Sequence, residues 1–238
     1  MKKSEVVNEN LTFVVIISAD IEWQVVRDLF RQGDICTSPY GEWMDTQLEI
    51  KGTHQKVTFF QGGWGKIAAA ASAQYVIDHW APDLLLNLGT CGGFEGQINK
   101  GSIILVEKTI VYDILEQMVD LGEPLAHYTT NLNLSWLTDD YPEEVVRTLL
   151  ISADRDLVPE EIDSLKHKFN AVAGDWESGA IAFVAKRNGT KCLILRGVTD
   201  IVGSSGGEAY GDVQAFIRST KDILEQLVKT LPDWLALF

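Results

Sequence analysis

Short, continuous apolar segments alternate along this chain with segments of helical periodicity. Residues 11–18 (LTFVVIIS) and 84–89 (LLLNLG) have no polar face, which is typical of strands buried on both sides in a parallel sheet. The Ala-rich segment 66–80 predicts a helix, and apolar residues recur at helical spacing in about 213–229. Strands that alternate with helices pack as layers, so the pattern predicts an α/β fold with a largely parallel or mixed sheet.

The remaining segments fit the same organisation. Residues 45–61 hold two alternating segments, DTQLEIKG and KVTFFQ, which predict a hairpin or meander. Residues 115–145 are polar and poorly periodic, and we expect an excursion or flap there. No repeat, linker or low-complexity tract divides the chain, so we expect one domain over 1–238. The later segments predict, in order, a short strand at 172–176, a helix at 177–187, a strand at 191–200 and a glycine-rich loop at 204–211.

The charge of the chain argues against nucleic acid and anionic membranes as partners. It has 20 basic and 34 acidic residues, a net charge of −14, whereas nucleic-acid binding needs basic side chains that displace counterions from phosphate. No stretch approaches the roughly 18 apolar residues of a membrane span. The N-terminal MKKSEVVNEN is unlike a secretory leader, and the three cysteines form no disulfide or metal-binding pattern. We therefore expect a cytoplasmic protein without a metal site.

Three carboxylates follow predicted strands. Glu22 comes after the first strand, Glu177 after the VAGDW segment, and Asp200 at the end of LILRGVTD. Ligands of open α/β sheets bind at the carboxyl ends of the strands, so these three side chains are placed to converge on one pocket. Each also has a simpler explanation. Glu22 and Glu177 suit the first turn of a helix, where the dipole favours negative charge, with Asp20 as an expected N-cap, and Asp200 suits a turn.

Two glycine-rich segments do not match the phosphate-binding motifs that they resemble at first sight. GGWGKI (62–67) lacks the leading glycine and the Ser/Thr of a P-loop. GTCGGFEG (89–96) does not keep the spacing of a dinucleotide fingerprint. The second segment has the alternative interpretation of a tight turn with left-handed glycines. Neither segment predicts a bound cofactor, and we expect none.

Five segments together, in order, resemble the nucleoside phosphorylase and nucleosidase family, most closely its methylthioadenosine/S-adenosylhomocysteine nucleosidase branch. The resemblance covers nearly the whole chain except 115–145, and it implies a three-layer α/β/α fold with a central mixed, partly barrel-like sheet. It also implies a homodimer and a small-molecule nucleoside as substrate. The matching segments are VVIISADIEW (14–23), GGWGKIAAA (62–70), PDLLLNLGTCGG (82–93), GDWESGAIAFVA (174–185) and LILRGVTDIVG (193–203).

The resemblance implies roles for the three carboxylates. Asp200 matches the catalytic aspartate, Glu177 the glutamate that holds the ribose hydroxyls, and Glu22 the glutamate that activates water. Physical chemistry agrees with this division. A purine leaves readily only when a ring nitrogen is protonated, and a carboxylic acid with a raised pKa can supply that proton. A second carboxylate then deprotonates water on the opposite face of the sugar, as in an inverting glycosidase.

The resemblance also implies pocket residues, with two departures from the family pattern. Thr90 matches a pocket serine near the water, Trp64 lies where an apolar residue lines the sugar side, and Tyr210 matches an aromatic of the closing loop. Asp156 stands where the family has a phenylalanine that stacks on the base, and Trp176 replaces a methionine. Asp156 is expected either to accept from an exocyclic amino group, which favours adenine, or to point to solvent or pair with an arginine.

The predicted function is hydrolysis of the N-glycosidic bond of an adenine nucleoside such as methylthioadenosine or S-adenosylhomocysteine. Two alternatives stay open. A nucleoside phosphorylase would use phosphate as the nucleophile, but Asn87 stands where hexameric phosphorylases of the family carry a phosphate-binding arginine. A non-catalytic nucleoside sensor would keep the pocket without needing both Asp200 and Glu22.

Overall fold

The structure, a computed structural model, describes residues 11–30, 33–118, 122–138 and 140–238. Its first strand, β1 (Phe13–Ile17), is buried throughout and lies between β4 (Thr53–Gln61) and β5 (Leu84–Phe94), parallel to both. Alternate residues of β1 face opposite sides. Phe13, Val15 and Ile17 pack in one apolar core, and Val14 and Ile16 pack in another. A strand that is apolar on both faces is therefore covered on both faces, as the sequence predicts.

Eleven strands of the described residues form one mixed sheet, in which five strands close into a barrel. The strands follow the order β11-β10-β6-β8-β9-β5-β1-β4-β3-β2, and β7 pairs with β6 at the side of this path. An additional pairing of β10 with β5 closes the strands between them into a ring. The ring is thus β5, β9, β8, β6 and β10. The strands not yet delimited are β2 (Cys36–Thr37), β3 (Glu42–Ile50), β6 (Ile103–Val111), β7 (Thr129–Asn131), β8 (Val145–Ser152), β9 (Ala173–Asp175), β10 (Cys192–Gly203) and β11 (Gly206–Gly207).

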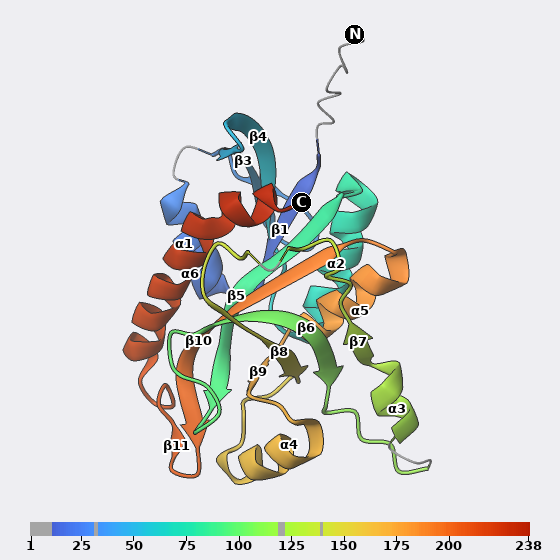
Figure 1. The fold of residues 1–238 in the computed structure, drawn as a ribbon, viewed down its shortest axis with the longest axis vertical. Coiled ribbons are helices and arrows are strands. Elements are labelled where there is room, and N and C mark those ends of the chain that lie inside the picture. The colour runs from blue at the N-terminus through green and yellow to red at the C-terminus, as the bar shows by residue number, and fades with distance from the viewer. Residues whose placement is uncertain (1–10, 31–32, 119–121, 139) are drawn as a thin grey trace.

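Helices cover the sheet from two sides, which gives three layers (Figure 1). On one side α1 (Asp20–Leu29) and α6 (Val213–Ala236) pack together against β1, β5 and β10. On the other side lie α2 (Gly65–Trp80) and α5 (Ser178–Asn188), which contribute alanines to the second core. The α/β class and the partly barrel-like mixed sheet expected from the sequence are confirmed. The remaining helical elements are α3 (Gly122–His127), the 3-10 turn η1 (Pro159–Glu161) and α4 (Ile162–Phe169).

Two local expectations are wrong. Ala19, and not Asp20, is the N-cap of α1, because the Glu22 carboxylate accepts the Ala19 N–H and so takes the capping role. The GTCGG segment is not a turn. Strand β5 continues through it to Phe94, with Gly92 and Gly93 paired to β9. A Cβ on Gly93 would lie 2.7 Å from side-chain atoms of Ile98 and Val198, so the glycine serves close packing within a strand.

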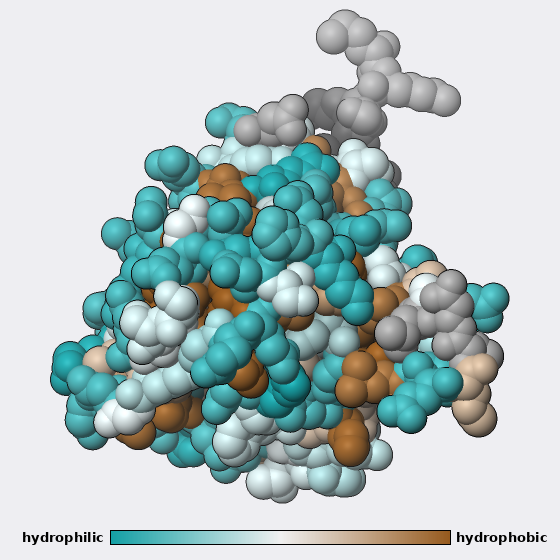
Figure 2. Space-filling model, turned by 90° about the horizontal axis from the view of Figure 1, so that it is seen from below, coloured by the Kyte–Doolittle hydropathy of each residue, from teal (hydrophilic) through white to brown (hydrophobic). Residues whose placement is uncertain are grey.

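Two expectations from the sequence concern segments that lie partly or wholly outside the described residues. The 115–145 excursion contains α3 and β7, but residues 119–121 and 139 lie outside the described residues. Residues 1–10, on which the expectation about a leader rests, also lie outside them. Within the described ranges, every helix is too short or too polar to span a bilayer. Seen from below, the surface is mostly hydrophilic, with hydrophobic residues in small groups (Figure 2).

Candidate active site

A cavity of about 310 Å³ opens at the carboxyl ends of β1, β8 and β9 and beside the second halves of β5 and β10. This is the edge of the sheet at which α/β proteins bind ligands. All eight residues that the sequence singles out contribute to its wall, although they are spread over nearly the whole chain. They are Glu22, Trp64, Thr90, Asp156, Trp176, Glu177, Asp200 and Tyr210.

A β-bulge directs Asp200 into the cavity. In the pairing of β10 with β5, Val198 faces Cys91 and Asp200 faces Gly92, so Thr199 is an extra residue. Such a bulge bends the strand and re-aims the side chains that follow it. Burial of Asp200, which is 7% exposed, raises the pKa of its carboxyl group, while the Thr199 hydroxyl donates to its Oδ1 at 2.9 Å and opposes that shift. A carboxyl with a raised pKa is suited to donate a proton.

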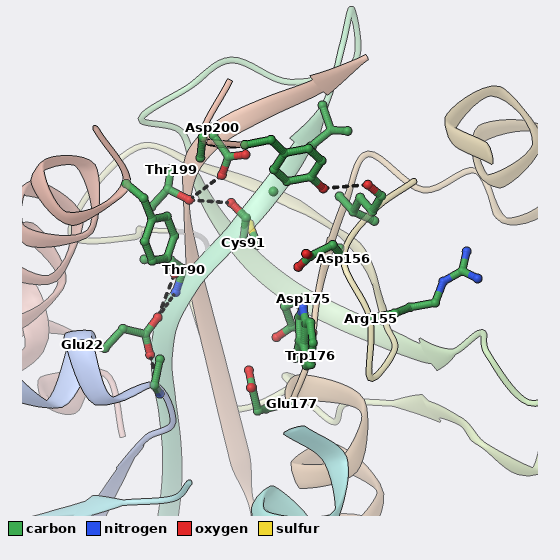
Figure 3. A pocket seen from close by; sticks show the side chains of 18 of the residues that line it. Glu22, Thr90, Cys91, Arg155, Asp156, Asp175, Trp176, Glu177, Thr199 and Asp200 are labelled. Carbon is green, nitrogen blue, oxygen red and sulfur yellow. Dashed lines mark hydrogen bonds between the residues drawn. The ribbon is translucent and has the colours of Figure 1, made fainter. Parts of the chain in front are cut away.

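Glu22 lies on the other side of the cavity from Asp200 (Figure 3). Its carboxylate accepts hydrogen bonds from the Thr90 N–H at 2.7 Å and the Thr90 Oγ1 hydroxyl at 2.8 Å, in addition to the N–H of Ala19 at 3.2 Å. Glu22 therefore caps α1, as its simpler explanation requires, and lines the cavity as well. The bonds to Thr90 fix the carboxylate in one orientation between α1 and β5.

Glu177 is the N-cap of α5, and it faces the cavity from the floor in Figure 3. Its Oε1 accepts the Gly65 N–H at the start of α2 at 3.1 Å. Burial, and after it the negative charge of Asp175, raises the pKa of Glu177 to about 8. A carboxyl group between two helix N-termini is well placed to accept hydrogen bonds from neighbouring hydroxyls of a ligand.

The raised pKa of Glu177 predicts a pH-dependent stability. Its ordinary value is 4.5 and its value in the folded protein is about 8. Between these values the folded state holds a proton that the unfolded state has released, so the free energy of unfolding falls as the pH rises. Glu177→Gln is expected to remove this component, which is at most about 1.4 kcal/mol per pH unit. Urea unfolding at several pH values measures it, with Glu160→Gln on the surface as control. Equal slopes in wild type and Glu177→Gln would contradict the assignment.

Two tryptophans form one wall of the cavity. The rings of Trp64 and Trp176 lie 5.3 Å apart between centroids with an angle of 30° between their planes. Trp64 is the N-cap of α2 and is 71% exposed, so it stands at the mouth, while Trp176 follows β9. The pair provides an aromatic surface beside Glu177.

Asp156 and Tyr210 approach the cavity from two loops. The Asp156 carboxylate points inward, whereas the neighbouring Arg155 points away (Figure 3). Arg155 forms an ion pair with Glu161, so the expected alternative in which Asp156 pairs with Arg155 does not describe this structure. The Tyr210 hydroxyl donates to the Leu157 carbonyl at 2.6 Å, which ties the glycine-rich 204–211 loop to the segment after β8.

Sequence reasoning missed a buried ion pair beneath the cavity. Arg196 on β10 is 1% exposed, and its Nε donates to Asp175 Oδ2 at 2.8 Å. Asp175 also accepts from the hydroxyls of Ser152 and Ser178. A charged residue within an otherwise apolar strand, as in LILRGV, was the signal available in the sequence, because such a residue is rarely buried without a partner.

Asn87 belongs to the same network and does not line the cavity. Its Nδ2 donates to the Ile16 carbonyl at 3.0 Å, and its Oδ1 accepts from Arg196 Nη2 at 2.6 Å. Arg196 Nη1 is buried without a hydrogen-bond partner. Atom Nη1 would lie 2.5 Å from a Cβ on Gly89, and Glu22 Oε1 would lie 2.9 Å from the same Cβ. The free guanidinium N–H and the Glu22 carboxylate therefore face one small space beside Gly89.

Gly89 is expected to be essential for this arrangement. In Gly89→Ala the added methyl group must displace Arg196 or Glu22, because both contacts are shorter than any that a real Cβ makes. Misplacement of a reacting group by about 1 Å can cost roughly 10²-fold in rate, and we expect a loss of that order in the kcat of the reaction expected from the sequence. Gly33→Ala is the matched control, since a Cβ there would have its closest contacts at an ordinary 3.5 Å. Steady-state kinetics of both variants test this prediction, and full activity of Gly89→Ala would refute it.

Comparison with known proteins identifies the family. A sequence profile of the phosphorylase superfamily matches residues 14–231. The chain belongs to the phosphorylase superfamily. This superfamily member is 24% identical over 230 residues to the 5′-methylthioadenosine/S-adenosylhomocysteine nucleosidase of Bacillus subtilis, over 90% of this chain and 97% of that protein. It is 27% identical over 206 residues to the 5′-methylthioadenosine/S-adenosylhomocysteine nucleosidase of Maridesulfovibrio salexigens. That alignment covers 81% of this chain and 88% of the other protein.

Solved structures agree with the fold of this superfamily member. The 5′-methylthioadenosine/S-adenosylhomocysteine nucleosidase of Neisseria meningitidis, in complex with methylthio-immucillin-A, has a TM-score of 0.75 at 19% identity and covers 96% of this chain and 100% of its own. The MTA/SAH nucleosidase of Streptococcus pneumoniae, in complex with 8-aminoadenine, has a TM-score of 0.75 at 16% identity, with 95% and 100% covered. The resemblance seen in the sequence is confirmed.

Proposed function

We propose that this protein is a purine nucleosidase that hydrolyses the N-glycosidic bond of an adenine nucleoside. The observation that carries the proposal is the placement of Asp200 and Glu22 on two sides of one cavity in different environments. Asp200 is a buried acid with a raised pKa, and Glu22 is a carboxylate that accepts three hydrogen bonds. Two carboxyl groups that differ in this way divide the roles of acid and base.

The proposed reaction follows from these positions. Asp200 donates a proton to a ring nitrogen of the purine, and the C1′–N bond breaks with its electron pair going to the base. Glu22 removes a proton from a water molecule that attacks the opposite face of the sugar. Glu177 holds the ribose hydroxyls, which lowers the entropic cost of the step by orientation.

Water is the proposed nucleophile because the cavity offers little to a phosphate ion. Among the described residues that line it, Arg155 is the basic one, and it points away from the interior. Arg196 lies under the floor and is paired with Asp175. A phosphate dianion would instead meet Glu22, and like charges repel. This observation favours hydrolysis over the phosphorolysis that other members of the superfamily carry out.

The substrate class is proposed from the names of the relatives and from the cavity. Several relatives are named 5′-methylthioadenosine/S-adenosylhomocysteine nucleosidases. Trp64 at the mouth offers an apolar surface to a 5′ substituent, and Tyr210 and Trp176 offer rings to the base. Asp156 is proposed to accept from the exocyclic amino group of adenine, which hypoxanthine lacks.

We further propose a homodimer in which α2 contributes to the interface. Trp64 and Ile67 near the start of α2 are 71% and 86% exposed. Large apolar side chains exposed together beside a binding site are characteristic of surfaces that a partner covers. The whole chain, residues 1–238, is proposed to act as one domain, and the cytoplasm is the proposed location because Cys36, Cys91 and Cys192 are free thiols.

A panel of purine nucleosides with purified protein tests the proposed function against the sensor alternative. Free base is measured by chromatography after incubation with adenosine, inosine and their 5′-alkylthio derivatives, and binding is measured by calorimetry. We expect adenine to be released, and faster from the adenine nucleosides than hypoxanthine from the inosine series. Tight binding without release of base from any nucleoside would identify a sensor and contradict the proposal.

A further inference from the structure

Asp156 is a carboxylate in the cavity without a counter-charge from the protein. Among the residues that the structure describes, it has no hydrogen bond or ion pair. The neighbouring Arg155 is held elsewhere, since it pairs with Glu161 and its guanidinium lies 5.7 Å from the centre of the Tyr112 ring. Figure 3 shows the two side chains pointing in opposite directions. Asp156 is exposed, so its charge meets solvent until a ligand covers it.

The rest of the cavity does not neutralise this charge. Arg196 is bound to Asp175 and Asn87 below the floor, so its charge is balanced there. The remaining acidic residues of the wall are Glu22, Asp175, Glu177 and Asp200, and Asp175 is the partner of Arg196. Glu177 carries a proton at neutral pH because its pKa is raised to about 8, whereas Asp156 has no basic partner among the described residues of the wall. The interior thus has a negative potential that an anionic ligand would oppose and a cationic ligand would satisfy.

An aromatic ring lies close to Asp156. Tyr210 lines the cavity together with Asp156, and burial, followed by the negative charge of Asp156, raises the pKa of its phenol to about 12. The bond from the Tyr210 hydroxyl to the Leu157 carbonyl fixes the ring over this end of the cavity. Trp176 lines the same cavity. A cation next to aromatic faces and a carboxylate is stabilised by both.

From this environment we propose that the cavity prefers purine nucleosides whose base is positively charged over neutral isomers, and that Asp156 selects the charge. The inference rests on the proposed function in that a nucleoside is the ligand. A neutral base that covers Asp156 removes water from the carboxylate and replaces it with at most the hydrogen bonds of an amino group. A cationic base supplies the missing charge.

The reaction gains from the same property. When the C1′–N bond of a cationic N-alkylpurine nucleoside breaks, its electron pair neutralises the base, which leaves as a neutral molecule. The sugar carbon takes the oxygen of water, and the proton of that water passes to Glu22. The base therefore needs no proton from Asp200.

Pairs of methylated isomers test the selection, because the members of a pair have the same methyl group and differ in charge. 1-Methyladenosine and 7-methylguanosine are cations at mildly acidic pH, and N6-methyladenosine and O6-methylguanosine are neutral. Binding is measured by calorimetry on wild type, Asp156→Asn and the control Asp163→Asn, whose side chain is 85% exposed on α4. In at least one pair we expect the cation to bind about tenfold more tightly than its neutral isomer to wild type and to the control. In Asp156→Asn we expect the two isomers of that pair to bind equally.

Equal binding of both isomers to wild type in both pairs, or a preference that persists in Asp156→Asn, would overturn the inference. Absence of binding by either cation would overturn it as well. Release of base is measured separately on the same samples. If no nucleoside is cleaved but the Asp156-dependent preference is found, the proposed hydrolysis fails and the selection stands. If base is released while the isomers bind equally, the proposed hydrolysis stands and the selection by Asp156 fails.

Discussion

Replacing Asp200 by asparagine is expected to reduce kcat by at least about 10²–10⁴-fold, the usual contribution of a general acid. Asparagine keeps the shape of the side chain and its contact with Thr199 but has no proton to give. The bulge at Thr199 holds position 200 toward the cavity in either case. Substrate affinity should change far less than kcat, because the lost interaction belongs to the transition state.

Single-turnover kinetics and equilibrium binding of Asp200→Asn measure these two quantities separately. Asp222→Asn on the exposed side of α6 serves as control and should behave as wild type. Turnover of Asp200→Asn near that of wild type would remove Asp200 from the mechanism. A loss of affinity as large as the loss of rate would instead make it a binding residue.

Replacing Arg196 by methionine is expected to destabilise the fold by about 3–5 kcal/mol, the cost of leaving a buried charge without its partner. Asp175 would then keep only the Ser152 and Ser178 donors in a site where it is 8% exposed. Asn87 would lose its bond from Arg196 Nη2. Because α5 begins beside Asp175, the start of that helix and Glu177 should be disturbed with it.

Urea unfolding of Arg196→Met measures the loss. Arg147→Met is the matched control, because its ion pair with Glu107 is 46% and 45% exposed and should contribute less than about 1 kcal/mol. In Arg196→Met combined with Asp175→Leu, part of the stability should return, since no unpaired charge remains. An Arg196→Met protein as stable as wild type would show that the pair does not hold the barrel together.

The fold was predictable from the sequence where burial dictates composition. The LTFVVIIS and LLLNLG runs lie on β1 and β5, and the amphipathic segment that begins near Val213 is α6. That helix extends to Ala236, beyond the expected end near 229, because Leu231, Trp234 and Leu235 continue its buried face. The capping of α1 was misplaced by one residue because a distant contact, Glu22 with Thr90, fixes the first turn.

The candidate site was predictable in its membership and less so in its geometry. Carboxylates at the ends of parallel strands meet at one edge of a sheet, so the sequence alone allows Glu22, Glu177 and Asp200 to be grouped. The Arg196–Asp175 pair could not be derived, since it joins residues on different strands. The inward orientation of Asp156 depends on the partner that Arg155 takes, Glu161, and no local pattern specifies that choice.

In the proposed reaction water, and not phosphate, attacks the nucleoside. The most direct test is the release of adenine from 5′-methylthioadenosine in phosphate-free buffer and in buffer with phosphate, with the sugar product identified by mass spectrometry. We expect equal rates and a free sugar in both buffers, because the cavity has no inward-facing basic side chain among its described lining residues. Release of base only with phosphate, together with a sugar 1-phosphate as product, would contradict it.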